Sequence, residues 1–209
     1  MKIEKPVRTL YNLLVKKAPV EAQLIITRRC NLSCGYCTEY DDFSPPVPYE
    51  DLRLRIDAIH RLKVVHITLL GGEPLMHPQL AEIVSYGRQH STVSITTNGF
   101  LVSDAIIEKL NTVNLNHMQV SIDAGEVDPT KYIQKTLKPL RPKLERLKKL
   151  AKFDVHLNAV LCEQSKGQVK RMLEEAKEIG LPISFSVVHD EVGRKAISGE
   201  PYLDRKSVV

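Results

Sequence analysis

The chain alternates short apolar runs with longer stretches of helical periodicity, and this order constrains its fold more than any other feature. Six runs have the length of strands: residues 22–27, 64–70, 93–98, 117–123, 155–161 and 183–189. Helical patterns lie between them, near residues 50–62, 79–90, 103–110, 140–152 and 168–179. This order predicts a parallel sheet in which a helix connects each strand to the next.

Four of these strands carry polar side chains on one face, although parallel strands covered on both faces are usually apolar throughout. The polar positions are Ser94, Thr96 and Asn98, then Gln119, Ser121 and Asp123, then His156 and Asn158, and finally Ser184 and Ser186. Alternation of this kind indicates that helices cover one face of the sheet while the other face lines a polar space. We therefore expect an α/β fold, a partial (β/α)6 barrel of the TIM type with parallel strands and a ligand in its lumen.

The length of 209 residues suits one such domain. A short helix is expected near residues 5–17, before the first strand. After Asp190 the sequence has no strong helical pattern, so the sixth unit is expected to be incomplete. The predicted division is an N-terminal helical extension at residues 1–20, a core domain at residues 21–190 and a C-terminal tail at residues 191–209.

Charge and hydropathy restrict where the protein acts and what it binds. No apolar run is long enough to span a bilayer and no signal-peptide pattern follows Met1, so we expect a cytoplasmic protein. The net charge of +5 is local, because residues 131–152 contain nine Lys or Arg and one acid, while the remainder is slightly acidic. Nucleic-acid binding by the whole domain is therefore disfavoured.

Within this basic segment, leucines at positions 140, 144, 147 and 150 recur at helical spacing. The spacing predicts a helix with a buried leucine stripe and outward-facing lysines. A solvated helix face is the simpler interpretation. Docking of an acidic partner is the alternative.

Three of the four cysteines, Cys30, Cys34 and Cys37, fall within eight residues, directly after the first predicted strand. Small and polar residues among them, and the proline-rich stretch at residues 44–48, favour a loop at the carboxyl end of that strand, where barrels build ligand sites. A structural zinc site normally needs four protein ligands, and no fourth Cys or His lies nearby. Three thiolates instead suit an iron–sulfur cluster with one iron left open. The remaining cysteine, Cys162, is expected to be a small buried apolar residue.

The spacing Cys-x3-Cys-x2-Cys, with the aromatic Tyr36 before the last cysteine, resembles the signature of the radical S-adenosylmethionine (SAM) superfamily. The sequence "GGEP", residues 71–74, follows the second predicted strand, where that superfamily places its methionine-binding motif. The sequence "TTNG", residues 96–99, ends the third strand as in many members. The resemblance covers nearly all six units, and the structural context expected for each motif agrees.

The resemblance implies that Cys30, Cys34 and Cys37 hold a [4Fe-4S] cluster whose fourth iron binds the methionine amino and carboxylate groups of SAM. Reductive cleavage of SAM would yield a 5′-deoxyadenosyl radical that abstracts hydrogen from an unidentified substrate, such as a peptide or a cofactor or lipid precursor. A reductant such as flavodoxin or ferredoxin is implied as a partner. The predicted basic helix offers a docking surface for it, formed by Lys143, Lys148, Lys149 and Lys152.

The resemblance also implies roles for further residues around SAM. Gly71 and Gly72 would let the backbone approach the ligand, Glu73 would supply a carboxylate to the methionine ammonium, and Pro74 would fix the chain direction. The remaining candidates are Tyr36 near the adenine, and Asn98, Ser121 and Asp123 at carboxyl strand ends facing SAM or the substrate. Three histidines are weaker candidates: His189, with Asp190, ends the sixth strand, whereas His66 and His156 are expected to bond within the barrel.

Two other functions remain open on the sequence. Within the class, the alternative is a glycyl-radical activating enzyme. Outside it, the alternative is a non-catalytic protein that binds zinc or carries electrons. The 209 residues contain no Cys-rich extension for further clusters, so the chain is either a minimal enzyme or a fragment of a longer one.

Overall fold

The computed structural model describes residues 6–34, 37, 39–125, 135–161 and 167–187, and its centre is one parallel sheet. Six strands pair in chain order, β1-β2-β3-β4-β5-β6. Their bounds are β1 Glu21–Thr27, β2 His66–Gly71, β3 Thr92–Thr97, β4 His117–Ile122, β5 Asp154–Leu161 and β6 Ile183–Val187. All six predicted strands are confirmed, and none begins more than two residues from its prediction.

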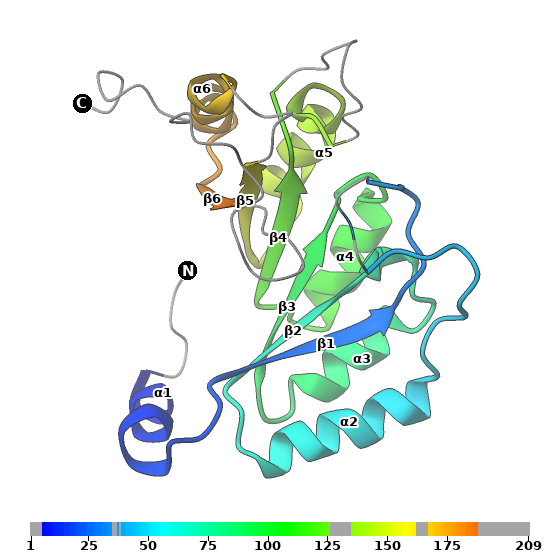
Figure 1. Ribbon diagram of the computed structural model, residues 1–209, viewed down its shortest axis with the longest axis vertical. Helices are drawn as coiled ribbons and strands as arrows, with labels where there is room; N and C mark the ends of the chain where they lie inside the picture. Colours follow the sequence, from blue (N-terminus) through cyan, green and yellow to red (C-terminus); the bar gives the residue numbers. More distant parts are fainter. Residues whose placement is uncertain (1–5, 35–36, 38, 126–134, 162–166, 188–209) are drawn as a thin grey trace.

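A helix follows each of the first five strands, and these helices pack against one face of the sheet (Figure 1). They are α2 Tyr49–Arg61, α3 Leu80–Gly87, α4 Asp104–Thr112, α5 Leu137–Leu150 and α6 Val169–Ile179. The core between them and the sheet contains fully buried side chains such as Ile67, Ile95, Met118 and Leu144. Strand order without reversal and a helix in every crossover give the winding of a TIM-type barrel, left open between β1 and β6.

The opposite face of the sheet lines a cavity of about 600 Å³, which is the predicted polar lumen. Its lining includes Ser94, Thr96, Gln119, His156 and Ser184, from four neighbouring strands. Several polar groups there already bond to one another.

Histidines occupy the amino-terminal end of this lumen. The two ring nitrogens of His66 lie 2.7 Å from Thr92 Oγ1 and 2.9 Å from Ser94 Oγ. His156 stacks on His117 and shares a hydrogen bond with it. Burial is the main cause that lowers the pKa of His117 to about 4, and the neighbouring His156 is the second. The expectation that His66 and His156 bond within the barrel is confirmed.

The predicted N-terminal helix is present as α1 Pro6–Tyr11, continued by the π-helical turn η1 Asn12–Lys16. It contacts the barrel through polar groups, because Arg8 donates to His90 O at 2.8 Å and Asn12 donates to Lys63 O at 2.9 Å. Its apolar side chains point outward, with Val7 81% and Leu14 70% exposed. No described helix is long and apolar enough to cross a bilayer.

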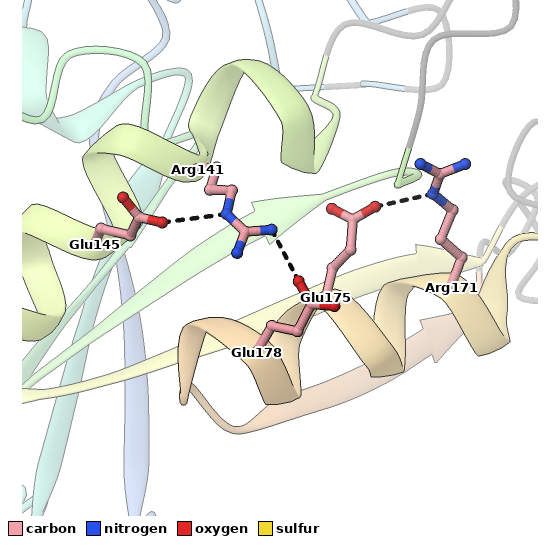
Figure 2. A network of polar contacts seen from close by, with 5 residues as sticks. All are labelled: Arg141, Glu145, Arg171, Glu175 and Glu178. Carbon is pink, nitrogen blue, oxygen red and sulfur yellow. Dashed lines mark hydrogen bonds and ion pairs between the residues drawn. The ribbon is translucent and has the colours of Figure 1, made fainter.

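The basic helix α5 buries Leu137, Leu140, Leu144 and Leu147, which confirms the leucine stripe one turn earlier than predicted. Its outer face is tied to α6: Arg141 contacts both Glu145 and Glu178 at 3.1 Å, and Arg171 contacts Glu175 nearby (Figure 2). Arg141–Glu178 joins the two helices, whereas Arg141–Glu145 lies within α5 and Arg171–Glu175 within α6. Both arginines lie at the surface, so these pairs add little to stability.

The end of the predicted sixth strand and the predicted tail, residues 188–209, lie outside the described residues. The proposed domain boundaries at residues 20 and 190 therefore stay predictions.

Candidate functional site

The cysteines lie in a loop, residues 28–41, at the carboxyl edge of β1. The base of this cysteine loop is closed by a parallel bridge between Arg29 and Asp41 and by a hydrogen bond from Asp41 N to Arg28 O at 3.0 Å. The Asp41 carboxylate accepts from Ser44 N at 2.9 Å and from Ser44 Oγ at 2.6 Å, and these bonds lower its pKa. Asp41 therefore fixes the C-terminal end of the cysteine loop.

The three cysteines of the loop differ in their exposure. Cys30 and Cys34 are half-buried and Cys37 is exposed, and Cys37 N donates to Cys34 O at 3.0 Å. Burial raises the pKa of the Cys30 and Cys34 thiols, and each of these thiols also interacts electrostatically with Cys37. Among the described residues, no three ligating side chains already have the geometry of a bound metal ion.

The GGEP motif is joined by backbone contacts to the chain that enters the cysteine loop. Gly72 N donates to Thr27 O and Glu73 N donates to Arg29 O, both at 2.8 Å. A Cβ on Gly71, whose φ is +135°, would lie 2.0 Å from Thr27 O, and a Cβ on Gly72 would lie 2.2 Å from Arg29 O. The glycines are thus required by contacts within the protein, independently of the ligand contact expected from the sequence.

We expect Gly72→Ala to be strongly destabilising. Its Cβ would overlap backbone carbonyls that cannot rotate away, so the whole junction between GGEP and the cysteine loop must shift. Gly167→Ala is the matched control, because Gly167 has a φ of +78° but, among the described residues other than its chain neighbours, no atom lies within 4 Å of the position that a Cβ would take. In thermal unfolding, the control should lose about 1 to 2 kcal/mol of unfolding free energy from backbone strain alone, and Gly72→Ala should lose more. Equal losses would contradict the steric explanation.

Glu73 is the fully buried centre of the site, with an exposed fraction of 0%. Oε1 accepts from Leu75 N at 2.9 Å and from Thr97 Oγ1 at 2.7 Å, and Oε2 accepts from Asn98 N at 2.8 Å. Burial raises the pKa of the carboxyl, and the three donors oppose that rise. Glu73 therefore connects the GGEP motif to the TTNG motif.

Asn98, which follows β3, extends this connection to the cysteine loop. Its Nδ2 donates to Asn31 Oδ1 at 2.8 Å and to Cys30 Sγ at 3.6 Å, while its Oδ1 accepts from Phe100 N at 3.0 Å. Leu32 N also donates to Cys30 Sγ, at 3.4 Å. Sequence reasoning placed Asn98 beside SAM and did not anticipate its contact with Cys30 or the part played by Asn31.

Asp123, directly after β4, forms a buried ion pair with Lys135, whose Nζ lies 3.3 Å from Asp123 Oδ1. Both side chains are less than a tenth exposed. Burial raises the pKa of Cys34 and of Glu73, and the charge of Lys135 acts against that rise in both groups. Sequence reasoning missed Lys135.

The other predicted residues divide into two groups. Ser121 lies on the lumen side of β4, in register with Asn158 of β5, and Pro74 opens the short helix η2 Pro74–Met76. Tyr36, Cys162, His189 and Asp190 lie outside the described residues. Three motifs distant in sequence, the cysteine loop, GGEP and TTNG, are thus brought together at one edge of the sheet.

The family model described as the radical SAM superfamily matches residues 24–197, most of the chain. The chain belongs to the radical SAM superfamily. Members of this superfamily are enzymes that use a [4Fe-4S] cluster and SAM. The resemblance seen in the cysteine, GGEP and TTNG motifs is thereby confirmed.

Curated relatives act on different substrates. The chain is 28% identical to the AdoMet-dependent heme synthase of Methanosarcina barkeri, over 74% of this chain and 46% of the relative. It is 30% identical to the PqqA peptide cyclase of Granulibacter bethesdensis (74% and 43%) and 30% identical to the GTP 3′,8-cyclase of Syntrophomonas wolfei (78% and 53%). The chain therefore spans about half the length of these relatives.

Among solved structures, SuiB of Streptococcus suis has a similar fold. The TM-score is 0.72 at 18% identity, over 96% of this chain and 49% of SuiB. A second SuiB structure, bound to the precursor peptide SuiA, gives 0.69 at 17% identity, over 87% of this chain and 43% of SuiB. At this identity the similarity establishes the fold, and the partial barrel predicted from the sequence is confirmed.

Proposed function

We propose that this chain is the catalytic core of an enzyme that reductively cleaves SAM and uses the 5′-deoxyadenosyl radical to remove hydrogen from a substrate. The observation that supports this most is the connection of the three motifs. Gly72 and Glu73 bond to the chain entering the cysteine loop, and the Glu73 carboxylate bonds to Thr97 and Asn98. When bound, the [4Fe-4S] cluster and SAM supply the one-electron chemistry.

Cys30, Cys34 and Cys37 would hold three irons of this cluster, and two of them have neighbours that favour the thiolate form. Backbone and side-chain N–H groups donate to Cys30 Sγ, and these bonds lower the thiol pKa against the effect of burial. The ammonium of Lys135 lowers the pKa of Cys34 in the same way. Burial remains the largest cause and raises the pKa of both thiols, so these contacts offset it only in part, and the positive charge of bound iron would complete the stabilisation of the thiolates.

SAM would occupy the rim formed by GGEP and the ends of β3 and β4. We assign the methionine ammonium to Glu73, whose Oε2 accepts a hydrogen bond from Asn98 N and keeps a second lone pair for another donor. The remaining polar contacts are assigned to Asn98, Ser121 and Asp123. Tyr36 is proposed near the adenine.

Glu73→Gln tests this assignment with two readouts. The amide brings an N–H₂ group against existing donors, so the apo protein should lose about 1 to 3 kcal/mol of unfolding free energy. Loss of the charged contact should also weaken SAM binding about ten- to a hundredfold in the reconstituted protein, while iron content stays unchanged. Unchanged SAM affinity would contradict the ammonium contact, and unchanged stability would contradict the internal role.

The lumen favours a peptide or another neutral polar substrate. Of the described residues that line the cavity of about 600 Å³, none is Lys or Arg, and most carry amide, hydroxyl or imidazole groups. A nucleoside triphosphate would find no fixed cation there. The relatives include both a PqqA peptide cyclase and a GTP 3′,8-cyclase, so the preference for a peptide rests on the residues that line the cavity.

The function is tested by anaerobic reconstitution of the wild-type chain. About four iron and four sulfide per chain, a reduced-cluster paramagnetic resonance spectrum altered by SAM, and formation of 5′-deoxyadenosine with dithionite would support the proposal. Stoichiometric zinc, or a spectrum indifferent to SAM, would overturn it. A glycyl-radical activating enzyme remains the alternative, and a glycyl-radical protein encoded alongside would favour it.

We place the reaction in the cytoplasm, with flavodoxin or ferredoxin as the reductant. Lys148, Lys149 and Lys152, at and after the end of α5, form the proposed docking surface. Lys143, predicted to belong to this surface, donates to Val102 O at 2.9 Å and is engaged within the protein.

Reversal of the three docking lysines to Glu should slow turnover driven by flavodoxin, with less difference at high salt, because screening weakens the attraction of exposed charges. Turnover driven by dithionite should stay unchanged, which controls for damage to the site. Equal slowing with both reductants would remove the docking role.

A further inference from the structure

We infer that Asn98 raises the reduction potential of the cluster by donating a hydrogen bond to the ligating sulfur of Cys30. This inference rests on the proposed function, because it requires a cluster on Cys30. It gives Asn98 a positioning and tuning role that is separate from any contact with SAM.

The orientation of the Asn98 amide follows from its partners. Its Oδ1 accepts from Phe100 N at 3.0 Å, so the oxygen must face that backbone group. The two hydrogens of Nδ2 are then directed toward Asn31 Oδ1 at 2.8 Å and Cys30 Sγ at 3.6 Å. A flipped amide would place an oxygen against the sulfur and would lose the Phe100 bond.

The backbone of Asn98 is fixed as firmly as its side chain. Asn98 N donates to Glu73 Oε2 at 2.8 Å, and Thr97 Oγ1 donates to Glu73 Oε1 at 2.7 Å. Gly99 follows at a φ of +79°, where a Cβ would lie 2.8 Å from Val120 Cγ1. Asn98 is only 8% exposed and Cys30 is half-buried, so the donor of the N–H···S contact is held within the protein.

A hydrogen bond to a ligating sulfur stabilises the reduced cluster, because reduction adds negative charge that the sulfurs share. Two donors lie against this sulfur, Leu32 N at 3.4 Å and Asn98 Nδ2 at 3.6 Å. The bond from Leu32 comes from backbone and survives any side-chain change. Asn98 is therefore the donor that a substitution can remove.

The test measures the midpoint potential of the reconstituted cluster, without SAM, by a redox titration followed with paramagnetic resonance. Asn98→Ala removes the donor, and Asn98→Asp keeps the shape and the acceptor for Phe100 N while removing the donor and adding charge. Both should shift the potential to more negative values, with the larger shift for Asp. Asn158→Ala is the matched control: Asn158 lies on β5, and its Oδ1 accepts from Ser184 and Ser186, both at 3.0 Å.

Three outcomes would overturn the inference. The first is a wild-type potential in both Asn98 variants, and the second is a shift of their potential to more positive values. The third is a shift in Asn158→Ala as large as that in the Asn98 variants, which would indicate general hydration of the lumen. If Asn98→Ala fails to assemble a cluster, the Asp variant decides alone, and its failure to assemble as well would also count against a tuning role. Failure of the wild-type chain to assemble a four-iron cluster would instead overturn the proposed function, and this inference with it.

Discussion

Replacing Cys30, Cys34 and Cys37 together with Ala should yield a folded protein that binds no iron and forms no 5′-deoxyadenosine. The stability of the barrel lies elsewhere, in a core of fully buried side chains between the sheet and its helices. The cysteines are half-buried or exposed, and the bridge between Arg29 and Asp41 closes the base of their loop without metal. Circular dichroism and thermal unfolding should therefore remain close to those of the apo wild type, while iron analysis shows none.

This result separates the cluster from a structural zinc site, where metal binding supplies folding free energy and loss of the ligands unfolds the domain. Cys162→Ala is the matched control, and it should keep both the cluster and 5′-deoxyadenosine formation. Loss of the cluster in Cys162→Ala would point to four cysteine ligands with no iron open to SAM. Unfolding of the triple variant would point to a structural metal.

The elements of the fold were predictable because their signals are local. Alternation along 92–97 or 117–122 marks a strand with one polar face, and leucines at 140, 144 and 147 mark a buried helical stripe. The three cysteines and the two glycine-containing motifs could be assigned together for the same reason. Each is a short string whose neighbours predict its place at a strand end.

The contacts that unite the site were not predictable, because they join residues far apart in the chain. Glu73 accepts from Thr97 and Asn98, and Asn98 donates to Asn31 and Cys30. No spacing rule relates these positions. The glycines of GGEP were explained by a ligand, whereas contacts with Thr27 and Arg29 already require them.

Lys135 was missed for a different reason. It belongs to the basic segment at residues 131–152, whose charge predicts a solvated surface. Its burial follows from its ion pair with Asp123, just before α5 begins. The sequence does not show which lysine of a basic segment is buried, because the net charge of the segment is the same whichever lysine that is.

Lys135→Ala should be one of the most destabilising single substitutions in this domain. It removes the ammonium that neutralises the Asp123 carboxylate, which is 5% exposed and cannot recover its hydration without opening the site. Removing one partner of a buried ion pair costs about 3 to 5 kcal/mol. For a chain of this size, the midpoint of thermal unfolding should fall by about 10 °C.

Arg146→Ala is the matched control, because it breaks an ion pair with Asp104 whose side chains are 50% and 53% exposed. The unfolding free energy lost in Arg146→Ala should stay below about 1 kcal/mol. The neutral pair Lys135→Met with Asp123→Asn should recover much of the stability, since no buried charge then lacks its counter-charge. A double-mutant cycle over these variants measures the coupling directly. If Lys135→Ala costs no more than Arg146→Ala, or if neutralising Asp123 gives no recovery, the pair does not stabilise the site in the way its burial indicates.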